Sequence, residues 1–171
     1  MLTRPENSEY APYYSQYIAR VPEGDLFAFF AEQLKRYRGA MTRTNEIAAA
    51  RPRRDGEWTI KDVLAHVADG ERVFGYRALR FSRGDTKELA GWDQDEYARE
   101  AHATLRTLDS LLNEFEYLRR ANIAMFQAMN DEATMRTGVA NANRVSVRAL
   151  AYIAGGHAEH HLILLKERFG L

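Results

Sequence analysis

The sequence contains no cysteine among its 171 residues. Disulfide bonds, thiolate metal ligands and a cysteine nucleophile are therefore excluded, and any sulfur nucleophile would have to arrive as a cosubstrate. The sequence also lacks a long apolar run and a start with the features of a signal peptide. We therefore expect no membrane-spanning segment, no membrane partner and a cytoplasmic location.

Neither sign of charge is in excess. Lys+Arg and Asp+Glu both number 24, which gives a formal net charge of +0. Nucleic-acid binding needs a positive field that displaces counterions, so this balance argues against a nucleic-acid partner. Arg51, Arg53 and Arg54 form a short basic run, but Pro52 within it favours a solvated loop.

The length and the hydrophobic share indicate an ordinary globular protein. A chain of 171 residues with 46% hydrophobic side chains can bury one core and is short for two. No internal repeat and no low-complexity tract occurs. We expect a single domain over residues 1–171.

Apolar residues recur at helical spacing in four long stretches, and no segment keeps the period-two alternation of a strand. The predicted helices cover roughly residues 25–50, 60–83, 93–129 and 147–169. The third stretch allows a break near residues 101–104. The predicted N-caps are Asp25, Thr59 and Ser146, and Asp62 stands where a capping box with Thr59 would need it.

The first stretch, to about Gly24, combines prolines with four tyrosines. This composition predicts a partly extended, aromatic arm that packs on the body of the protein. With the four amphipathic helices that follow, the sequence predicts an all-α fold, a four-helix bundle with an N-terminal arm.

Two histidines lie one helical turn apart near the C-terminus. His157 and His161 share a helix face, and His66 lies on the shoulder of the apolar stripe of the second predicted helix. Three protein ligands with one open position are typical of a catalytic metal site. The alternative is three core histidines whose ring nitrogens bond to the backbone or to carboxylates.

Glycines surround these histidines. Gly70 follows His66 by four residues, and Gly155 and Gly156 precede His157. Because glycine inside a helix costs about 1 kcal/mol relative to alanine, three of them indicate close backbone approach or space for a ligand. Ordinary helix packing, which also uses glycine, is the alternative.

Known metal motifs do not match the spacing. The zincin pattern needs Glu where Ala158 stands, the inverted pattern fails at Glu159, and no histidine has Glu three residues before it, as the di-iron bundles require. His160 can replace His161 as a ligand, but it points off the stripe and is interpreted as a supporting or surface residue. His102 is interpreted as solvated or at a helix end.

Several other residues are candidates for supporting roles. Glu71 falls inside an apolar stripe, so it either assists a ligand histidine or pairs with a buried arginine such as Arg148. Asp69 is either a hydrogen-bond acceptor for a ligand histidine or a solvated carboxylate. Aromatic residues can line the mouth of a pocket or plug the core, and these are Tyr13, Tyr14 and Trp92. No catalytic residue is assigned.

Five segments together resemble the DinB-like superfamily. They are Trp58–His66 with Asp69 and Glu71, Tyr76–Arg80, Gly91–Asp95, Val145–Leu150 and Gly156–His161. The resemblance covers nearly the whole chain, and the histidine segments are its most specific part. It implies a four-helix bundle in which His66, His157 and His161 bind a divalent metal ion, usually nickel or zinc.

The resemblance implies a metal-dependent enzyme that acts on a small-molecule substrate. Members with assigned activity mostly transfer a low-molecular-weight thiol to small electrophiles, and others are hydrolases or isomerases. We therefore expect a thiol S-transferase or hydrolase in stress response or detoxification, with a thiol as cosubstrate in the first case. The alternative is a non-catalytic, metal-stabilised bundle that binds a ligand or a partner. The resemblance also suggests a homodimer.

Overall fold

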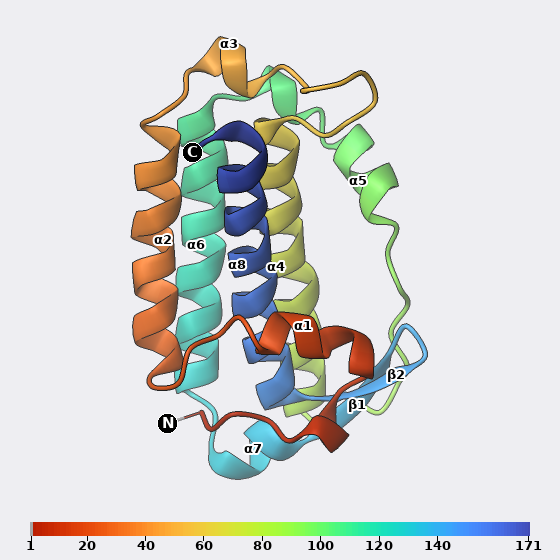
Figure 1. Ribbon diagram of the computed structural model, residues 1–171. Coiled ribbons are helices and arrows are strands. Elements are labelled where there is room, and N and C mark those ends of the chain that lie inside the picture. The colour runs from red at the N-terminus through yellow and green to blue at the C-terminus, as the bar shows by residue number, and fades with distance from the viewer. Residues whose placement is uncertain (1) are drawn as a thin grey trace.

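Four long helices lie side by side in the computed structural model, which describes residues 2–171 (Figure 1). They are α2 (Leu26–Met41), α4 (Ile60–Ser82), α6 (Leu108–Gln127) and α8 (Val147–Phe169). Figure 1 shows α2 and α8 running in one direction and α4 and α6 in the other, because the chain after α4 climbs back along the bundle before α6 begins. The predicted all-α, four-helix bundle is confirmed.

The helices begin where side chains cap their free N–H groups. Asp25 accepts from the backbone of Phe27 at the start of α2, and Ser146 accepts from Ala149 at the start of α8. Thr59 and Asp62 form a reciprocal capping box at the start of α4. All three predicted N-caps are therefore present.

The first predicted helix is too long at its C-terminal end. Helix α2 ends at Met41, and a separate short helix, α3 (Glu46–Ala49), follows it. The side chain of Asn45 accepts hydrogen bonds from the backbone N–H groups of Ile47 and Ala48. Asn45 thus starts a new helix where the sequence prediction continued the old one.

The third predicted helix is broken, as the alternative allowed. Helix α5 (Gln94–Glu100) is followed by the 3₁₀ turn η3 (Ala103–Leu105), and α6 begins only at Leu108. His102 lies between them in the left-handed region with φ of 45°. A residue in that conformation cannot continue a right-handed helix.

A small hairpin was not predicted. Strands β1 (Thr137–Ala140) and β2 (Asn143–Ser146) pair antiparallel after the short helix α7 (Asp131–Met135). The turn residues Asn141 and Ala142 have φ of 50° and 58°, as a two-residue turn of type I′ requires. Four-residue strands are too short to show a clear alternation, although Asn141 is a turn signal.

The N-terminal arm packs on the body, as predicted. It contains the 3₁₀ turns η1 (Asn7–Glu9) and η2 (Pro12–Tyr14) and the short helix α1 (Ser15–Ile18), which crosses α8 in Figure 1. Arg148 and Ser146 of the bundle both donate to the carboxylate of Glu9. The arm is therefore fixed to the start of α8.

The buried apolar side chains form two clusters, one at each end of the bundle. Along α8, residues up to Ala154 belong to one cluster and residues from Ala158 to the other. A polar layer separates them. Its buried polar members are Gln33, His66, Glu71, Arg119, His157, Glu159 and His161.

Within residues 2–171, no helix is both long enough and apolar enough to cross a membrane. The prediction of a single domain over residues 1–171 includes Met1, which lies outside the described residues, and it stays a prediction.

Candidate metal centre

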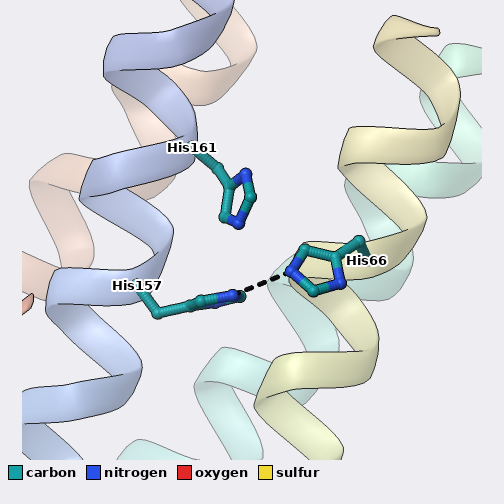
Figure 2. A group of neighbouring side chains, drawn as sticks. All are labelled: His66, His157 and His161. Carbon is teal, nitrogen blue, oxygen red and sulfur yellow. Dashed lines mark hydrogen bonds between the residues drawn. The ribbon is translucent and has the colours of Figure 1, made fainter. Parts of the chain in front are cut away.

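Helices α4 and α8 place the three predicted histidines in the polar layer. His66 comes from α4, and His157 and His161 come from successive turns of α8 (Figure 2). All three side chains are buried, with 2%, 5% and 9% of their surface exposed. The structure therefore brings together the residues that the sequence selected.

The three imidazoles face one another across the gap between the two helices. Nε2 of His66 lies 2.9 Å from Nε2 of His157, and one nitrogen from each of the three rings lies within 4.8 Å of the others. Zinc–nitrogen bonds of about 2 Å at tetrahedral angles would separate the ligand nitrogens by about 3.4 Å. The observed spacings bracket this value, so the donor set fits one divalent ion.

Unpartnered nitrogens also distinguish these histidines from core residues with a purely structural role. Nδ1 of His66 and Nδ1 of His161 are buried and have no hydrogen-bond partner within residues 2–171. Buried polar groups are normally bonded, because an unpaired one costs free energy. The alternative of histidines satisfied by backbone or carboxylates therefore does not describe this cluster.

Burial keeps the three imidazoles neutral. It lowers the pKa of His66 to about 4, with a smaller contribution from the nearby His160. The pKa values of His157 and His161 lie well below the usual value of 6.5, mainly because of burial and also because the rings neighbour one another. Neutral imidazole is the form that binds a metal, so the rings are ready for binding at pH 7.

Aromatic side chains enclose the histidines. The Trp92 ring stacks on His66 with centroids 5.4 Å apart and planes at 11°, and Trp58 lies 4.8 Å from His66 at 56°. Tyr17 contacts His157 edge-on at 5.6 Å. Trp92 therefore lies against the three histidines, in agreement with its interpretation as a residue that lines the site. Tyr13 and Tyr14 had the same interpretation, but the tyrosine in contact with His157 is Tyr17.

A pocket of about 260 Å³ adjoins the cluster at His161. Its walls are mostly apolar, and charged side chains stand among them. The lining includes Trp58, Val63, Leu164, Leu165, Phe169, Glu57, Asp95 and Arg168. A small molecule bound there would reach the histidines from the end of the bundle that carries the C-terminus.

Gly70 makes room for the ring of His157, and Gly156 makes room for the backbone of the arm. A Cβ atom at Gly70 would lie 2.8 Å from Cε1 of His157. At Gly156 a Cβ would lie 1.9 Å from the backbone oxygen of Tyr17. Close approach, one of the two readings of these glycines, is thus observed at both positions, to an imidazole and to the arm.

Glu71 pairs with a buried arginine, but with Arg119 and not with Arg148. Nη2 of Arg119 donates to Glu71 across 2.7 Å, and Asn122 donates to the second carboxylate oxygen. Arg148 pairs with Glu9 on the arm. The prediction named Arg148 because Glu71 and Arg148 were both expected to be buried. The chain between α4 and α6 runs back along the bundle, and this places α6, and with it Arg119, beside α4.

Gln33 extends this pair into a network over all four helices. Its side-chain oxygen accepts from Arg119, and its amide nitrogen donates to Glu159. Arg36 donates to both oxygens of Glu159. Arg119 also lies 4.1 Å above the ring of Phe30. We call Gln33, Glu71, Arg119 and Glu159 the Arg119 network, and His66, His157 and His161 the histidine cluster.

The remaining candidates lie outside the histidine cluster. His160 is half-buried on the side of the arm, with its ring 5.6 Å from Tyr17. His102 is exposed, as expected. Asp69 is half-buried and accepts from Arg72 at 3.4 Å, so it is not the acceptor for His66, whose Nδ1 has no partner.

Arg119 was not among the predicted buried polar residues, although the sequence carries a signal for it. It follows Phe115 by four residues and therefore lies on the apolar stripe of α6. Gln33 likewise lies on the stripe of α2. Polar residues on the buried stripes of two helices are the pattern that indicates a buried network.

The fold and the family are independently identified by comparison with known proteins. A family model described as the DinB superfamily matches residues 30–165. No curated protein matches the sequence. YfiT from Bacillus subtilis, described as a probable metal-dependent hydrolase with an unusual four-helix bundle topology, has a similar structure. Its TM-score is 0.72 at 17% identity, over 98% of this chain and 94% of that chain.

A second similar structure is the mycothiol-dependent maleylpyruvate isomerase. The TM-score is 0.67 at 13% identity, and the match covers 85% of this chain and 61% of that chain. At such identities the likeness to either structure shows the fold and not the reaction.

Proposed function

This chain belongs to the DinB superfamily, and from that premise we propose that the histidine cluster binds one divalent metal ion, at which the protein transfers a low-molecular-weight thiol to a small electrophile. The observation that carries the proposal is the convergence of three buried, neutral imidazoles, two of which, His66 and His161, have a buried nitrogen without a protein partner. The names of the two similar structures, a probable metal-dependent hydrolase and a mycothiol-dependent isomerase, agree with metal and thiol chemistry.

Nickel and zinc are the ions that the resemblance to the DinB-like superfamily implies, and imidazole binds both. A divalent ion held by three neutral ligands keeps its full charge and lowers the pKa of a thiol or water that binds in the open position. In the proposed reaction the sulfur forms a bond to the electrophilic carbon, and the leaving group departs with the thiol proton. No oxidant or reductant is needed.

The two buried carboxylates, as distinct from Glu57 and Asp95 in the lining of the pocket, support the thiol over water as the nucleophile. Metal-dependent hydrolysis commonly uses a nearby glutamate as general base. The two buried carboxylates of residues 2–171, Glu71 and Glu159, are both bonded to arginines. A thiol that loses its proton on binding needs no such base, and the chain supplies no cysteine of its own.

The protein's own residues would then bind and orient the substrates. The rings of Trp58 and Trp92 both contact the ring of His66. The pocket beside His161 offers mostly apolar walls to the body of an electrophile. Burial of the cluster beside Tyr17 of the arm and Trp92 limits the access of water, which favours sulfur transfer over hydrolysis.

Tryptophan fluorescence tests the metal site without any turnover. The only two tryptophans both contact His66, so titration of untagged, metal-free protein with Ni²⁺ is expected to quench nearly all of the emission. His157→Ala is expected to weaken the titration at least about tenfold. The matched control is His102→Ala, which removes an exposed histidine and is expected to titrate as the wild type does.

Turnover then separates the reactions. Metal-loaded protein is mixed with a thiol panel and an aryl halide, and product formation is expected only with metal, thiol and His157 all present. If product formed without added thiol, the protein would be a hydrolase and the proposal of thiol transfer would be wrong. Quenching without turnover in either assay would favour the non-catalytic, metal-stabilised bundle. If Ni²⁺ failed to quench the wild type, the metal site itself would be refuted.

The physiological setting is proposed on the same basis. A small-molecule thiol transferase of this family fits a role in stress response or detoxification. A homodimer and a cytoplasmic location stay predictions, and size-exclusion chromatography with light scattering tests the first.

A further inference from the structure

Three lysine or arginine side chains are buried within residues 2–171, namely Lys61, Arg77 and Arg119. Lys61 pairs with Glu46 at 2.7 Å, and Arg119 pairs with Glu71. Arg77 is 4% exposed, yet no carboxylate of the described residues lies within salt-bridge distance of it. It is therefore the one buried cation of residues 2–171 without a counter-ion.

The contacts of Arg77 are with neutral oxygen atoms. Its Nη2 donates to the backbone oxygen of Ala90 at 3.0 Å, and the side chain of Tyr14 lies near it. A guanidinium has five N–H donors and an invariant charge. Burying such a charge without an anion costs free energy, which a purely structural role does not explain.

Arg77 lies on the same face of α4 as His66. The two are 11 positions apart, which at about 100° per residue is three turns plus about 20°. Their Cα atoms are separated by about 16 Å along the axis. Because helical side chains lean toward the N-terminus of their helix, the side chain of Arg77 is directed back toward His66.

The segment Ala90–Trp92 contacts Arg77 at one end and the histidine cluster at the other. Ala90, which accepts from Arg77, stands two residues before Trp92, whose ring stacks on His66. Ala90 and Gly91 are exposed, so the cover over the guanidinium is thin. An extended ligand that lay along this segment would span the distance between the guanidinium and the metal position.

We propose that Arg77 binds the carboxylate of a substrate whose sulfur or electrophilic end lies at the histidine cluster. The anion would complete the pairing that the fold leaves open, through two parallel hydrogen bonds of the kind arginine makes with carboxylates. Arg77 thereby selects acidic over neutral ligands of the same length. The identity of the reactive end rests on the proposed function, whereas the carboxylate site itself stands on the contacts of Arg77.

Mercapto acids of increasing length test this site. Co²⁺-loaded protein is titrated with mercaptoacetate, mercaptopropionate, mercaptohexanoate and mercaptooctanoate, and with the mercaptoalcohols of equal length. Thiolate binding is followed by its charge-transfer absorption. We expect the acid to bind about tenfold more tightly than its alcohol at one optimal length, and this preference to disappear in Arg77→Met.

Arg80→Met is the matched control. Arg80 lies on the same helix one turn further along but already pairs with Asp85, so the preference for acids is expected to persist. Equal binding of acids and alcohols by the wild type, or an unchanged preference in Arg77→Met, would refute the assignment.

A measurement without metal separates this inference from the proposed function. Hexanoate is expected to raise the melting temperature of the metal-free wild type and to leave that of Arg77→Met unchanged, with hexanol inactive on both. If no thiol binds to the Co²⁺ protein but hexanoate still acts through Arg77, the proposed function fails and the carboxylate site stands. If hexanoate does not distinguish the two proteins, the carboxylate site fails.

Discussion

The histidine cluster and the Arg119 network occupy the same polar layer of the bundle, and helices α4 and α8 contribute residues to both. They differ in how their polar atoms are partnered. In the Arg119 network, Glu71 and Glu159 each accept from an arginine and from an amide. In the histidine cluster, two buried nitrogens have no partner within residues 2–171.

This difference indicates which buried polar group serves the fold and which serves a ligand. In the Arg119 network the charges of Glu71 and Arg119 are paired, and only Nε of Arg119 lacks a hydrogen-bond partner within residues 2–171. Such a network fixes the relative positions of four helices and leaves little for a ligand to bind. A cluster with unpartnered atoms contributes less to the stability of the folded protein, and a ligand that binds to it stabilises the folded state. The same contrast separates Arg119, which has its carboxylate, from Arg77, which does not.

The largest expected effect is on the stability of the Arg119 network. Arg119→Met leaves the carboxylate of Glu71 buried without its cation, which should lower the free energy of unfolding by about 3–5 kcal/mol. Urea denaturation of metal-free protein measures this change. His157→Asn should have a much smaller effect in the same assay, since it removes one neutral hydrogen bond, to His66, and leaves no buried charge unpaired.

Arg120→Met is the control for that comparison. Its side chain is 67% exposed and pairs with Glu116 on the same helix, so its loss should change stability by less than about 0.5 kcal/mol. If Arg119→Met proved as mild as Arg120→Met, the Arg119 network would not be what holds the polar layer together.

An intermediate effect is expected at Gly70, this time on the histidine cluster. In Gly70→Ala the new methyl group meets His157 at 2.8 Å and displaces its ring, so Ni²⁺ affinity should fall about tenfold. The urea midpoint should change little, because the helix preference of alanine, worth about 1 kcal/mol, offsets the crowding. Calorimetric titration and urea denaturation measure the two quantities.

Gly39→Ala is the matched substitution on α2, where a Cβ would have nothing within 4 Å. It should stabilise the protein slightly and leave Ni²⁺ affinity unchanged. Equal affinities for Gly70→Ala and Gly39→Ala would mean that the position of His157 does not limit metal binding.

The smallest effect is expected at the contact between the arm and α8, outside both groups. Burial alone would raise the pKa of Glu9, but hydrogen bonds from Arg148 and Ser146 outweigh it and lower the pKa from 4.5 to about 2. The folded state therefore favours the ionised carboxylate. Its contribution to stability is fully present above pH 4.5 and is lost as the pH falls toward 2.

Glu9→Gln removes this titration, so the difference in melting temperature between variant and wild type should shrink steadily over that acid range. A difference that stayed constant with pH would show that the ion pair with Arg148 does not anchor the arm. Ni²⁺ binding at pH 7 should be nearly the same in both proteins, because Glu9 touches neither group of the polar layer.

Several features were predictable from local sequence alone. Thr59 and Asp62 specify the start of α4, and Ser146 the start of α8, because capping involves residues only three positions apart. The spacing of His157 and His161 places both rings on one helix face for the same reason. The start of α3 at Asn45 and the hairpin turn at Asn141 carried local signals too, but an amphipathic stripe and short strands obscured them.

Other features depend on which helices become neighbours. Pairing with a buried arginine, such as Arg148, was one of the two alternatives for Glu71. Its partner is Arg119, because α6 packs beside α4 while Arg148 pairs with Glu9 of the arm. The sequence on either side of Arg77 does not indicate that its side chain will be buried without a carboxylate partner. Such facts concern residues far apart in the sequence, and only packing decides them.

The sequence by itself determined four amphipathic helices, most of their ends, and three histidines with the right periodicity to face a bundle interior, since these depend on short-range geometry and on the burial of apolar side chains. The tertiary structure alone decided that His66 meets the pair on α8, that Glu71 is neutralised by Arg119, and that Arg77 is left with neutral partners. These pairings follow from the order and direction in which the helices pack, and periodicity within one helix carries no information about its neighbours.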